Sequence, residues 1–243
     1  MRELPALRGD IVVLGARIPR AVALLAGLTF AATVGSVIAL QAGLPLVQLL
    51  ALEPERVWQG QLWRLLTWAF LELGLAPLGL VFACLVLISI GGQLTYRLGP
   101  TRFVLLYLAV AALSGGLTCL VGLLWPSVMS FPYTGAWPSI TALFVGWAVL
   151  VPNGRIFLSL ILPVRGRQVV YGSIAIAILY GIFYGFQVVV PELFAILIGM
   201  IYFRDPDLYR LWLRFRLLTL SRRGRPSHLR AVDRKDDRPR WLH

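Results

Sequence analysis

The fold of this chain is limited most by three long uncharged stretches, which begin after Arg20, Glu72 and Arg102. A helix that crosses a bilayer needs about 20 predominantly apolar residues. The chain of 243 residues is 58% hydrophobic and 14% charged, whereas soluble domains carry about 25% charged residues. The sequence therefore predicts a membrane protein. Its first three predicted spans are residues 21–42, 75–94 and 103–124.

The second half of the chain is interrupted by Gly and Pro, but it contains three further apolar segments. These segments are residues 137–151, 168–185 and 189–203. All but two of the 23 Lys and Arg residues fall in alternate connections, and the two exceptions are Arg56 and Arg64. Because cytoplasmic loops of membrane proteins are rich in Lys and Arg, this distribution predicts six spans with both termini in the cytoplasm.

The predicted domain organisation follows from these spans. A cytoplasmic N-terminal segment covers residues 1–20, the membrane domain covers 21–204, and a cytoplasmic basic tail covers 205–243. We expect an all-α, multi-pass protein of a bacterial-type inner membrane.

The basic tail carries much of the chain's net charge of +12. One helical face of the tail would present Leu208, Leu211, Trp212 and Phe215. Arg210 and Arg214 point away from that face, a pattern typical of a helix in the headgroup region. Because the tail follows a cytoplasmic span end, we expect it to bind anionic lipid of the cytoplasmic leaflet, not nucleic acid. Docking to a partner protein would give the same pattern.

The chain has two histidines, His228 and His243, and both lie in the tail. The apolar part therefore contains no Ser-His or Cys-His dyad, no haem-ligating histidine and no histidine-bound zinc. Cys84 and Cys119 lie in apolar runs without CxxC spacing, so we interpret them as small core residues, not metal ligands. We expect no cofactor.

The connection between the first two spans, residues 43–74, is long and rich in tryptophan. Tryptophan is enriched at the membrane–water interface, so we predict that this loop lies partly in the interface. Trp63 and Arg64 are either an interfacial anchor or a brace between the loop and the bundle. A predicted aromatic belt near the outer face comprises Trp58, Trp63, Trp68, Trp125 and Trp137.

Four short motifs follow one another along the chain. They are GQLWRLLTWAFL at 60–71, GPTRFVLLYL at 99–108, PNGR at 152–155 and LPVR at 162–165. In this order and spacing they resemble the rhomboid family, and the resemblance covers residues 55–204. It implies a six-helix bundle. In active members of the family, the bundle cuts transmembrane substrates with a Ser-His dyad inside a water-filled cavity.

The chemical positions of that family are replaced in this sequence. Where a rhomboid protease has Gly-x-Ser-Gly, residues 135–138 are GAWP, which puts Trp137 at the nucleophile. The resemblance places Glu192 at the family's histidine. It places Gly79 and Ala83 at the His and Asn that support the oxyanion, and neither side chain can donate a hydrogen bond. The resemblance therefore implies a pseudoprotease without the Ser-His dyad.

Glu192 and Ser139 have alternative interpretations. Glu192 is either a functional charge or a helix-terminal carboxylate, since Pro191 suits a first helical position and the helix dipole favours an acidic first turn. Ser139 with Glu192 as its base would form a non-standard protease site. A carboxylate is too weak a base to activate serine alone, so we interpret Ser139 as a hydroxyl bonded to backbone. Ala195 and Gly199, four residues apart, predict close helix approach.

The sequence predicts a catalytically inactive rhomboid-like protein, not an enzyme, that binds transmembrane segments of other proteins for recognition, escort or assembly. The alternative is a permanent structural subunit of a larger membrane complex, with the arginine-rich tail as its docking surface. Transport is less well supported because the spans carry few paired polar groups. An intramembrane protease with a non-standard site is the remaining alternative. The predicted structural or partner-binding residues are Trp63, Arg64, Ala195, Gly199, Arg210, Trp212 and Arg214.

Overall fold

The computed structural model of the chain describes residues 9–13, 16–74, 77–150, 155–158 and 162–204. Within this part, four helical stretches are long and apolar enough to cross a membrane. They are α1 (Arg20–Gln41), α5 (Leu78–Leu98), α6 (Pro100–Gly122) and Phe186–Phe203, where the 3-10 turn η3 (Phe186–Val189) continues into α10 (Val190–Arg204). Two shorter apolar helices accompany them, α8 (Trp137–Leu150) and α9 (Gly166–Tyr184).

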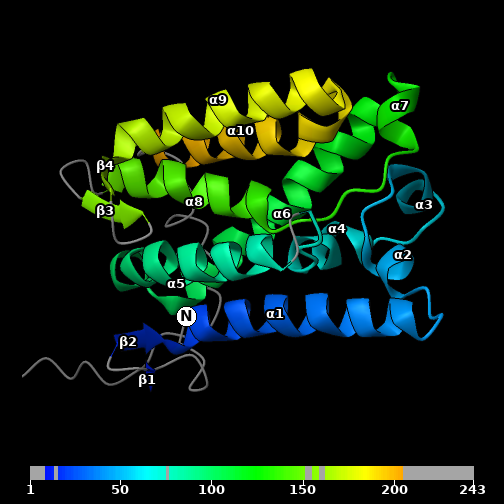
Figure 1. Cartoon of the computed structure of the whole chain (residues 1–243). Helices are drawn as coiled ribbons and strands as arrows, with labels where there is room; N and C mark the ends of the chain where they lie inside the picture. Colours follow the sequence, from blue (N-terminus) through cyan, green and yellow to red (C-terminus); the bar gives the residue numbers. More distant parts are fainter. Residues whose placement is uncertain (1–8, 14–15, 75–76, 151–154, 159–161, 205–243) are drawn as a thin grey trace, which may run out of the picture. The chain divides into compact units, whose positions relative to one another are not determined.

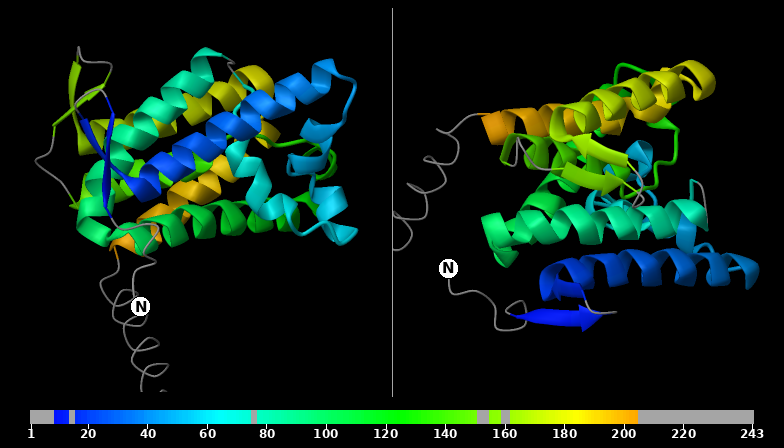
Figure 2. Two further views of the ribbon diagram at one scale, coloured as in Figure 1. Left: turned by 90° about the horizontal axis from the view of Figure 1, so that it is seen from below. Right: turned by 60° about the vertical axis from the view of Figure 1, so that its left-hand side comes forward.

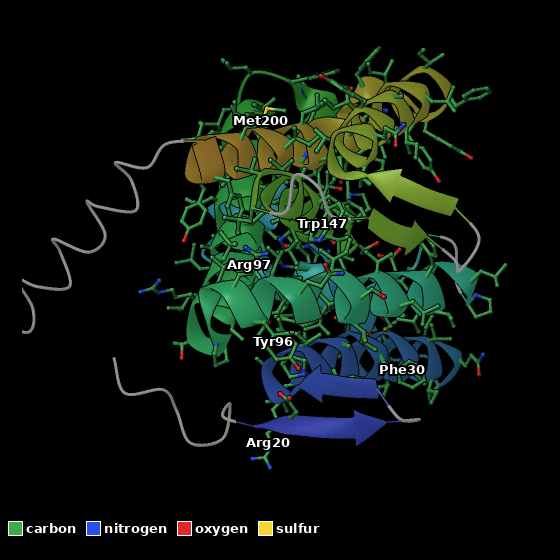
Figure 3. The ribbon with its side chains drawn as sticks, turned by 90° about the vertical axis from the view of Figure 1, so that its left-hand side faces the viewer. Arg20, Phe30, Tyr96, Arg97, Trp147 and Met200 are labelled. Atoms are coloured by element: carbon green, nitrogen blue, oxygen red, sulfur yellow. The ribbon has the colours of Figure 1, made fainter. Side chains whose placement is uncertain are left out.

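Helix α8 lies at the centre of the bundle, between α10 and α5 (Figure 1). Its residues from Pro138 to Trp147 are all buried, because α5, α6, α9 and α10 all pack against it. The indole of Trp147 points into the bundle (Figure 3), where its Nε1 donates a hydrogen bond to Gln93 Oε1 of α5 at 2.9 Å. A helix that is apolar on every side is suited to such an enclosed position.

Small residues let the helices approach closely at two crossings. A Cβ atom on Gly199 of α10 would lie 3.2 Å from the Ala142 Cα of α8. A Cβ atom on Gly91 of α5 would lie 2.8 Å from the Phe103 Cζ of α6. Ala195, one turn before Gly199, is fully buried. The packing of α8 on α10 and of α5 on α6 therefore depends on the absence of larger side chains at these positions.

The connection after α1 forms a group of short elements at one end of the bundle (Figure 1). These elements are α2 (Leu46–Leu50), α3 (Pro54–Trp58), α4 (Arg64–Thr67) and the 3-10 turn η2 (Trp68–Phe70). Helix α7 (Pro126–Met129), which follows α6, lies at the same end. Leu52 and Tyr133 exchange two backbone hydrogen bonds of 2.9 and 2.8 Å, which joins the segment between α2 and α3 to the segment that precedes α8.

Two short antiparallel hairpins lie at the opposite end of the bundle (Figure 2). The first pairs β1 (Asp10–Val13) with β2 (Ala16–Pro19), and the second pairs β3 (Arg155–Leu158) with β4 (Leu162–Arg165). The Tyr96 hydroxyl donates a hydrogen bond to Asp10 Oδ2 at 3.0 Å and so attaches the first hairpin to the end of α5.

The structure has a helix at each of the six segments that the sequence predicted. The predicted spans at 21–42, 75–94 and 103–124 correspond to α1, α5 and α6, and the shorter segments correspond to α8, α9 and α10. Four of these segments have the length and composition of a membrane span, so the count of six spans stays a prediction. The two β-hairpins were not predicted.

Candidate functional site

The segment before α8 is held in place by its backbone. Gly135 has a φ of +138°, a conformation that side chains disfavour and glycine adopts readily. Its N–H donates a hydrogen bond to the Trp68 carbonyl oxygen at 3.2 Å. The next N–H, that of Ala136, donates to Glu72 Oε2 at 3.1 Å. These bonds fix the position at which Trp137 enters the bundle.

Glu72 is a buried carboxylate in the loop between η2 and α5, with an exposed fraction of 2%. Its backbone N–H donates to Thr33 Oγ1 of α1 at 2.9 Å, and the Thr33 hydroxyl donates to the Phe70 carbonyl oxygen at 3.2 Å. Burial raises the pKa of Glu72 above its usual value, although hydrogen bonds from the Ala136 N–H, the Trp137 side chain and the Gly74 N–H act in the opposite direction. Glu72 thus links α1, the loop and the start of α8.

Trp137 is the first residue of α8, and its ring packs on Phe82 of α5. The two ring centroids are 5.7 Å apart and the ring planes are inclined by 29°, a stacked arrangement. Gly79 and Ala83 are buried on the same helix. Gly79 lies about one turn before Phe82, and Ala83 is the residue after Phe82. Trp137 therefore contacts the stretch of α5 that contains Gly79 and Ala83, the two positions that the resemblance assigned to the oxyanion groups.

Glu192 lies in the first turn of α10, as the sequence predicted from Pro191. Its Oε1 accepts a hydrogen bond from the Thr141 hydroxyl, one turn beyond Trp137 on α8. Ser139 is buried, and its hydroxyl donates to the Tyr107 carbonyl oxygen of α6 at 3.4 Å. Glu192 and Ser139 therefore have separate hydrogen-bond partners on different helices, in agreement with the interpretation of Ser139 as a hydroxyl bonded to backbone.

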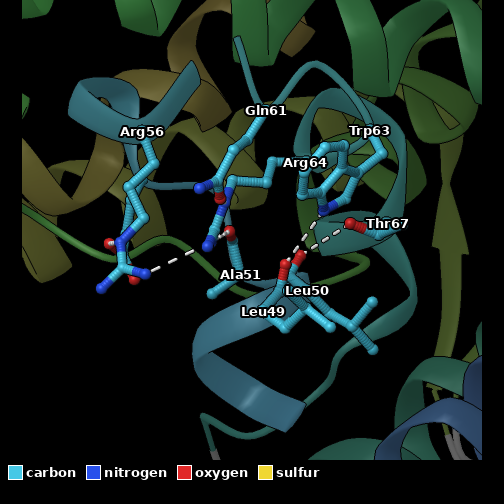
Figure 4. Close-up of polar contacts among 9 residues, drawn as sticks. Leu49, Leu50, Ala51, Arg56, Gln61, Trp63, Arg64 and Thr67 are labelled. Atoms are coloured by element: carbon cyan, nitrogen blue, oxygen red, sulfur yellow. Dashed lines mark hydrogen bonds and ion pairs between the residues drawn. The ribbon is translucent and has the colours of Figure 1, made fainter. Parts of the chain in front are cut away.

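Trp63 and Arg64 bind backbone groups of the loop between α1 and α5 (Figure 4). The Trp63 Nε1 donates to the Leu49 carbonyl oxygen at 3.3 Å. The Arg64 guanidinium is fully buried, and it donates from Nη1 to the Ala51 carbonyl oxygen at 2.5 Å and from Nε to Gln61 Oε1 at 2.7 Å. These contacts join α4 to the end of α2 and to the turn before α4.

Trp68 lies in the interior of the protein. Trp68 is 1% exposed and its Nε1 donates to the Leu65 carbonyl oxygen at 3.1 Å, so its inclusion in a surface aromatic belt was wrong. It is buried because it packs against α6, where a Cβ on Gly115 would lie 3.2 Å from its Nε1.

The predicted tail residues Arg210, Trp212 and Arg214 lie outside the described residues.

Sequence reasoning missed two residues of this site, Glu72 and Thr141. Glu72 was used only to mark the start of an uncharged stretch, although a lone carboxylate between Leu71 and Leu73 is itself a signal that it has a buried partner. Thr141 gave no signal, because threonine bonds its own helix backbone in most apolar helices.

Substitution of Glu72 by glutamine is expected to change how stability depends on pH. The folded protein holds the proton of Glu72 more tightly than the unfolded chain does, since burial raises the pKa in the folded state. The wild-type free energy of unfolding should therefore fall as the pH rises from about 4.5, the ordinary glutamate value, through the folded pKa. Glu72→Gln should lack this fall, because an amide oxygen still accepts the Ala136 N–H and carries no charge.

The measurement is the free energy of unfolding in detergent micelles at a series of pH values. Glu55→Gln is the matched control, since Glu55 is exposed on α3, and it should keep the wild-type dependence. An equal dependence on pH in the wild type and Glu72→Gln would contradict the burial of an ionisable group at this position.

The comparison with known families agrees with the geometry of the bundle. The model of the Rhomboid domain matches residues 59–203, a range that runs from the turn before α4 almost to the end of α10. No curated protein is similar enough to the chain to count as a match. The match to the family model includes the five apolar helices that follow α1 in the described part of the chain, α5, α6, α8, α9 and α10, and it covers more than half of the chain. The chain therefore belongs to the rhomboid family.

Proposed function

We propose that this member of the rhomboid family has no protease activity and binds transmembrane segments of other membrane proteins. The single observation that carries the proposal is the position of Trp137. The resemblance assigns Trp137 to the family's nucleophile position, and in the structure this residue begins α8 and stacks on Phe82 of α5. Its ring fills the space in which a substrate carbonyl would have to meet a nucleophile.

The remaining chemistry supports the loss of activity. A serine nucleophile needs a base that is within hydrogen-bond reach and is held in position. Glu192, at the family's histidine position, accepts a hydrogen bond from Thr141, and the sequence has no histidine before His228. Gly79 and Ala83 have no side-chain donor for an oxyanion. Each group that the reaction requires is therefore replaced by one that cannot perform its step.

The exposed face of α9 supports the binding of transmembrane segments. This helix packs on α8 and on the η3 turn that follows it. Many of its other side chains are large, apolar and exposed. Phe183 is 74% exposed and Tyr171 is 70% exposed. In a membrane, such a face is covered either by lipid or by another helix. Close packing between helices favours its coverage by another helix over its coverage by lipid. The face presents aromatic side chains that a partner helix can pack against.

The binding part of the proposal is tested by photo-crosslinking in native membranes. A photoreactive phenylalanine analogue replaces Phe183 on α9, and in a matched control it replaces Phe30, which is 52% exposed on α1 (Figure 3). Crosslinks to other membrane proteins are expected from position 183 and not from position 30. Several partners, each present below one copy per chain, favour a binder, whereas one partner at a fixed ratio favours a permanent subunit. Labelling by lipid alone at both positions would contradict the proposal.

The catalytic part is tested with the same purified protein in lipid bilayers. Neither the wild type nor Trp137→Ser is expected to cut a transmembrane substrate, because a new serine would still lack a histidine. Cleavage by the wild type that is lost in Ser139→Ala would show a non-standard protease and would contradict the proposed inactivity.

A further inference from the structure

A groove lies between the C-terminal part of α1 and the short helix α2. Its volume is about 270 Å³, slightly below the range of pockets that hold drug-sized ligands. The lining is apolar, with Ala39 from α1 and Leu44 and Leu49 from the next segment, except for Gln48 and Arg56. A groove of this size and lining is suited to a narrow apolar chain with a polar group at one end.

A loop contact puts the groove beside an exposed tryptophan, a residue that is enriched at the depth of lipid headgroups. Trp63, which is 47% exposed, donates its indole N–H to the carbonyl oxygen of Leu49, a residue of the groove lining. Exposed tryptophan in membrane proteins lies at the boundary between hydrocarbon and headgroups. Leu40 and Leu44 are also more than half exposed beside the groove. The groove therefore opens toward lipid on its apolar side and toward the headgroup layer at Arg56.

Arg56 supplies a positive charge at the edge of the apolar groove. Its Nε forms an ion pair with Glu53 Oε2, and its side chain is 45% exposed. The other oxygen of the same carboxylate lies 3.8 Å from the Nη1 of Arg64. One carboxylate, that of Glu53 just before α3, thus faces two guanidinium groups. The acid within α3, Glu55, does not line the groove. This arrangement leaves the Arg56 guanidinium able to bind an anion, and arginine is well suited to phosphate.

We propose that the groove binds one phospholipid, with part of an acyl chain between α1 and α2 and the phosphate on Arg56. An acyl chain matches the narrow apolar lining, and the phosphate matches the charge at the headgroup end. The lipid would lie between the end of α1 and the loop segment that contains α2. This site is independent of the region around Trp137, so the two proposals can fail separately.

The test uses the full-length chain in nanodiscs that contain phosphatidylglycerol with a photoreactive group in its acyl chain. The wild type is expected to be labelled within α1 and α2, and diacylglycerol with the same photoreactive chain, which lacks the phosphate, is expected to label these segments weakly. Arg56→Gln should reduce the phosphatidylglycerol label about fivefold, the effect of one basic residue on an anionic lipid. Ala39→Phe, which fills the groove, should remove most of the label.

Three matched variants separate lipid binding from structural effects. Glu53→Gln removes the same ion pair but keeps the guanidinium, so the label should not fall. Arg97→Gln removes an exposed arginine at the other end of the bundle, near the first hairpin. Ala31→Phe adds a phenyl ring, as Ala39→Phe does, but at an exposed position of α1. Both variants should be labelled as strongly as the wild type. Equal labelling by diacylglycerol, unchanged labelling in Arg56→Gln and Ala39→Phe, or a crosslink from the groove to another protein would overturn the proposal.

Discussion

Replacement of Gly199 by valine is expected to separate α8 from α10 and to cause a large loss of stability. A Cβ atom at this position would lie 3.2 Å from the Ala142 Cα and 3.3 Å from the Ala142 carbonyl oxygen. Both are backbone atoms, so no side-chain rotation relieves the contact. Overpacking of a core costs about 1–3 kcal/mol and sometimes more, and the two additional methyl groups of valine place this variant at or above the upper end.

The stability of the Gly199→Val variant is measured as the free energy of unfolding in detergent micelles. Gly116→Val is the matched control, because Gly116 also lies in a long apolar helix, α6, and a Cβ there meets nothing within 4 Å. The control should unfold at nearly the wild-type free energy. Gly199→Ala should fall between the two, since the better helix propensity of alanine partly offsets the clash. Equal stability of both valine variants would show that α8 and α10 do not pack through Gly199.

The positions of the long helices could be predicted because each depends on a local property of the sequence. The uncharged stretch that begins after Arg20 predicted a span at 21–42, and α1 is Arg20–Gln41. The close helix approach expected at Gly199 also depends on a local pattern, since small residues four apart lie on one helical face. The structure then identifies Ala142 as the partner, which no pattern within α10 could specify.

The interior of the candidate site could not be predicted in the same way, because its contacts join residues that are far apart in the chain. Glu72 and Ala136 are 64 positions apart, and Thr141 and Glu192 are 51 positions apart. Neither pair has a characteristic spacing. The resemblance to the rhomboid family identified which positions were replaced, but it could not show that Trp137 stacks on Phe82. That contact, which places the Trp137 ring against α5, is known only from the structure.

Two carboxylates, the buried Glu72 and the partly buried Glu192, bond α8 on either side of Trp137. Glu72 accepts the N–H of Ala136, immediately before Trp137, and Glu192 accepts the hydroxyl of Thr141, one turn after it. Each bond attaches α8 to a different part of the bundle. These polar groups therefore hold the start of α8 in a fixed position relative to the rest of the bundle.

Arg64→Ala is expected to loosen the loop between α1 and α5. The substitution removes the side chain that holds α4 to the end of α2 and to the turn before α4. The guanidinium is fully buried and bonds the Ala51 carbonyl oxygen and Gln61 Oε1. Hydrogen bonds to charged groups contribute about 1.5–3 kcal/mol each, and removal of one partner leaves the other buried and unsatisfied. We expect a loss of about 3 kcal/mol or more in the free energy of unfolding. Limited proteolysis within residues 43–71 should become faster.

Arg64→Lys should recover only part of this loss, because an ammonium group cannot reach two acceptors in the planar fork geometry of a guanidinium. Arg56→Ala in lipid-free detergent is the matched control. Arg56 shares the Glu53 carboxylate with Arg64, but its side chain is 45% exposed, and an exposed ion pair contributes about 0–1 kcal/mol. If Arg64→Ala and Arg56→Ala lose the same stability and are cut at the same rate, Trp63 and Arg64 act as an interfacial anchor. A loss confined to Arg64→Ala shows that the pair braces the loop through its buried guanidinium.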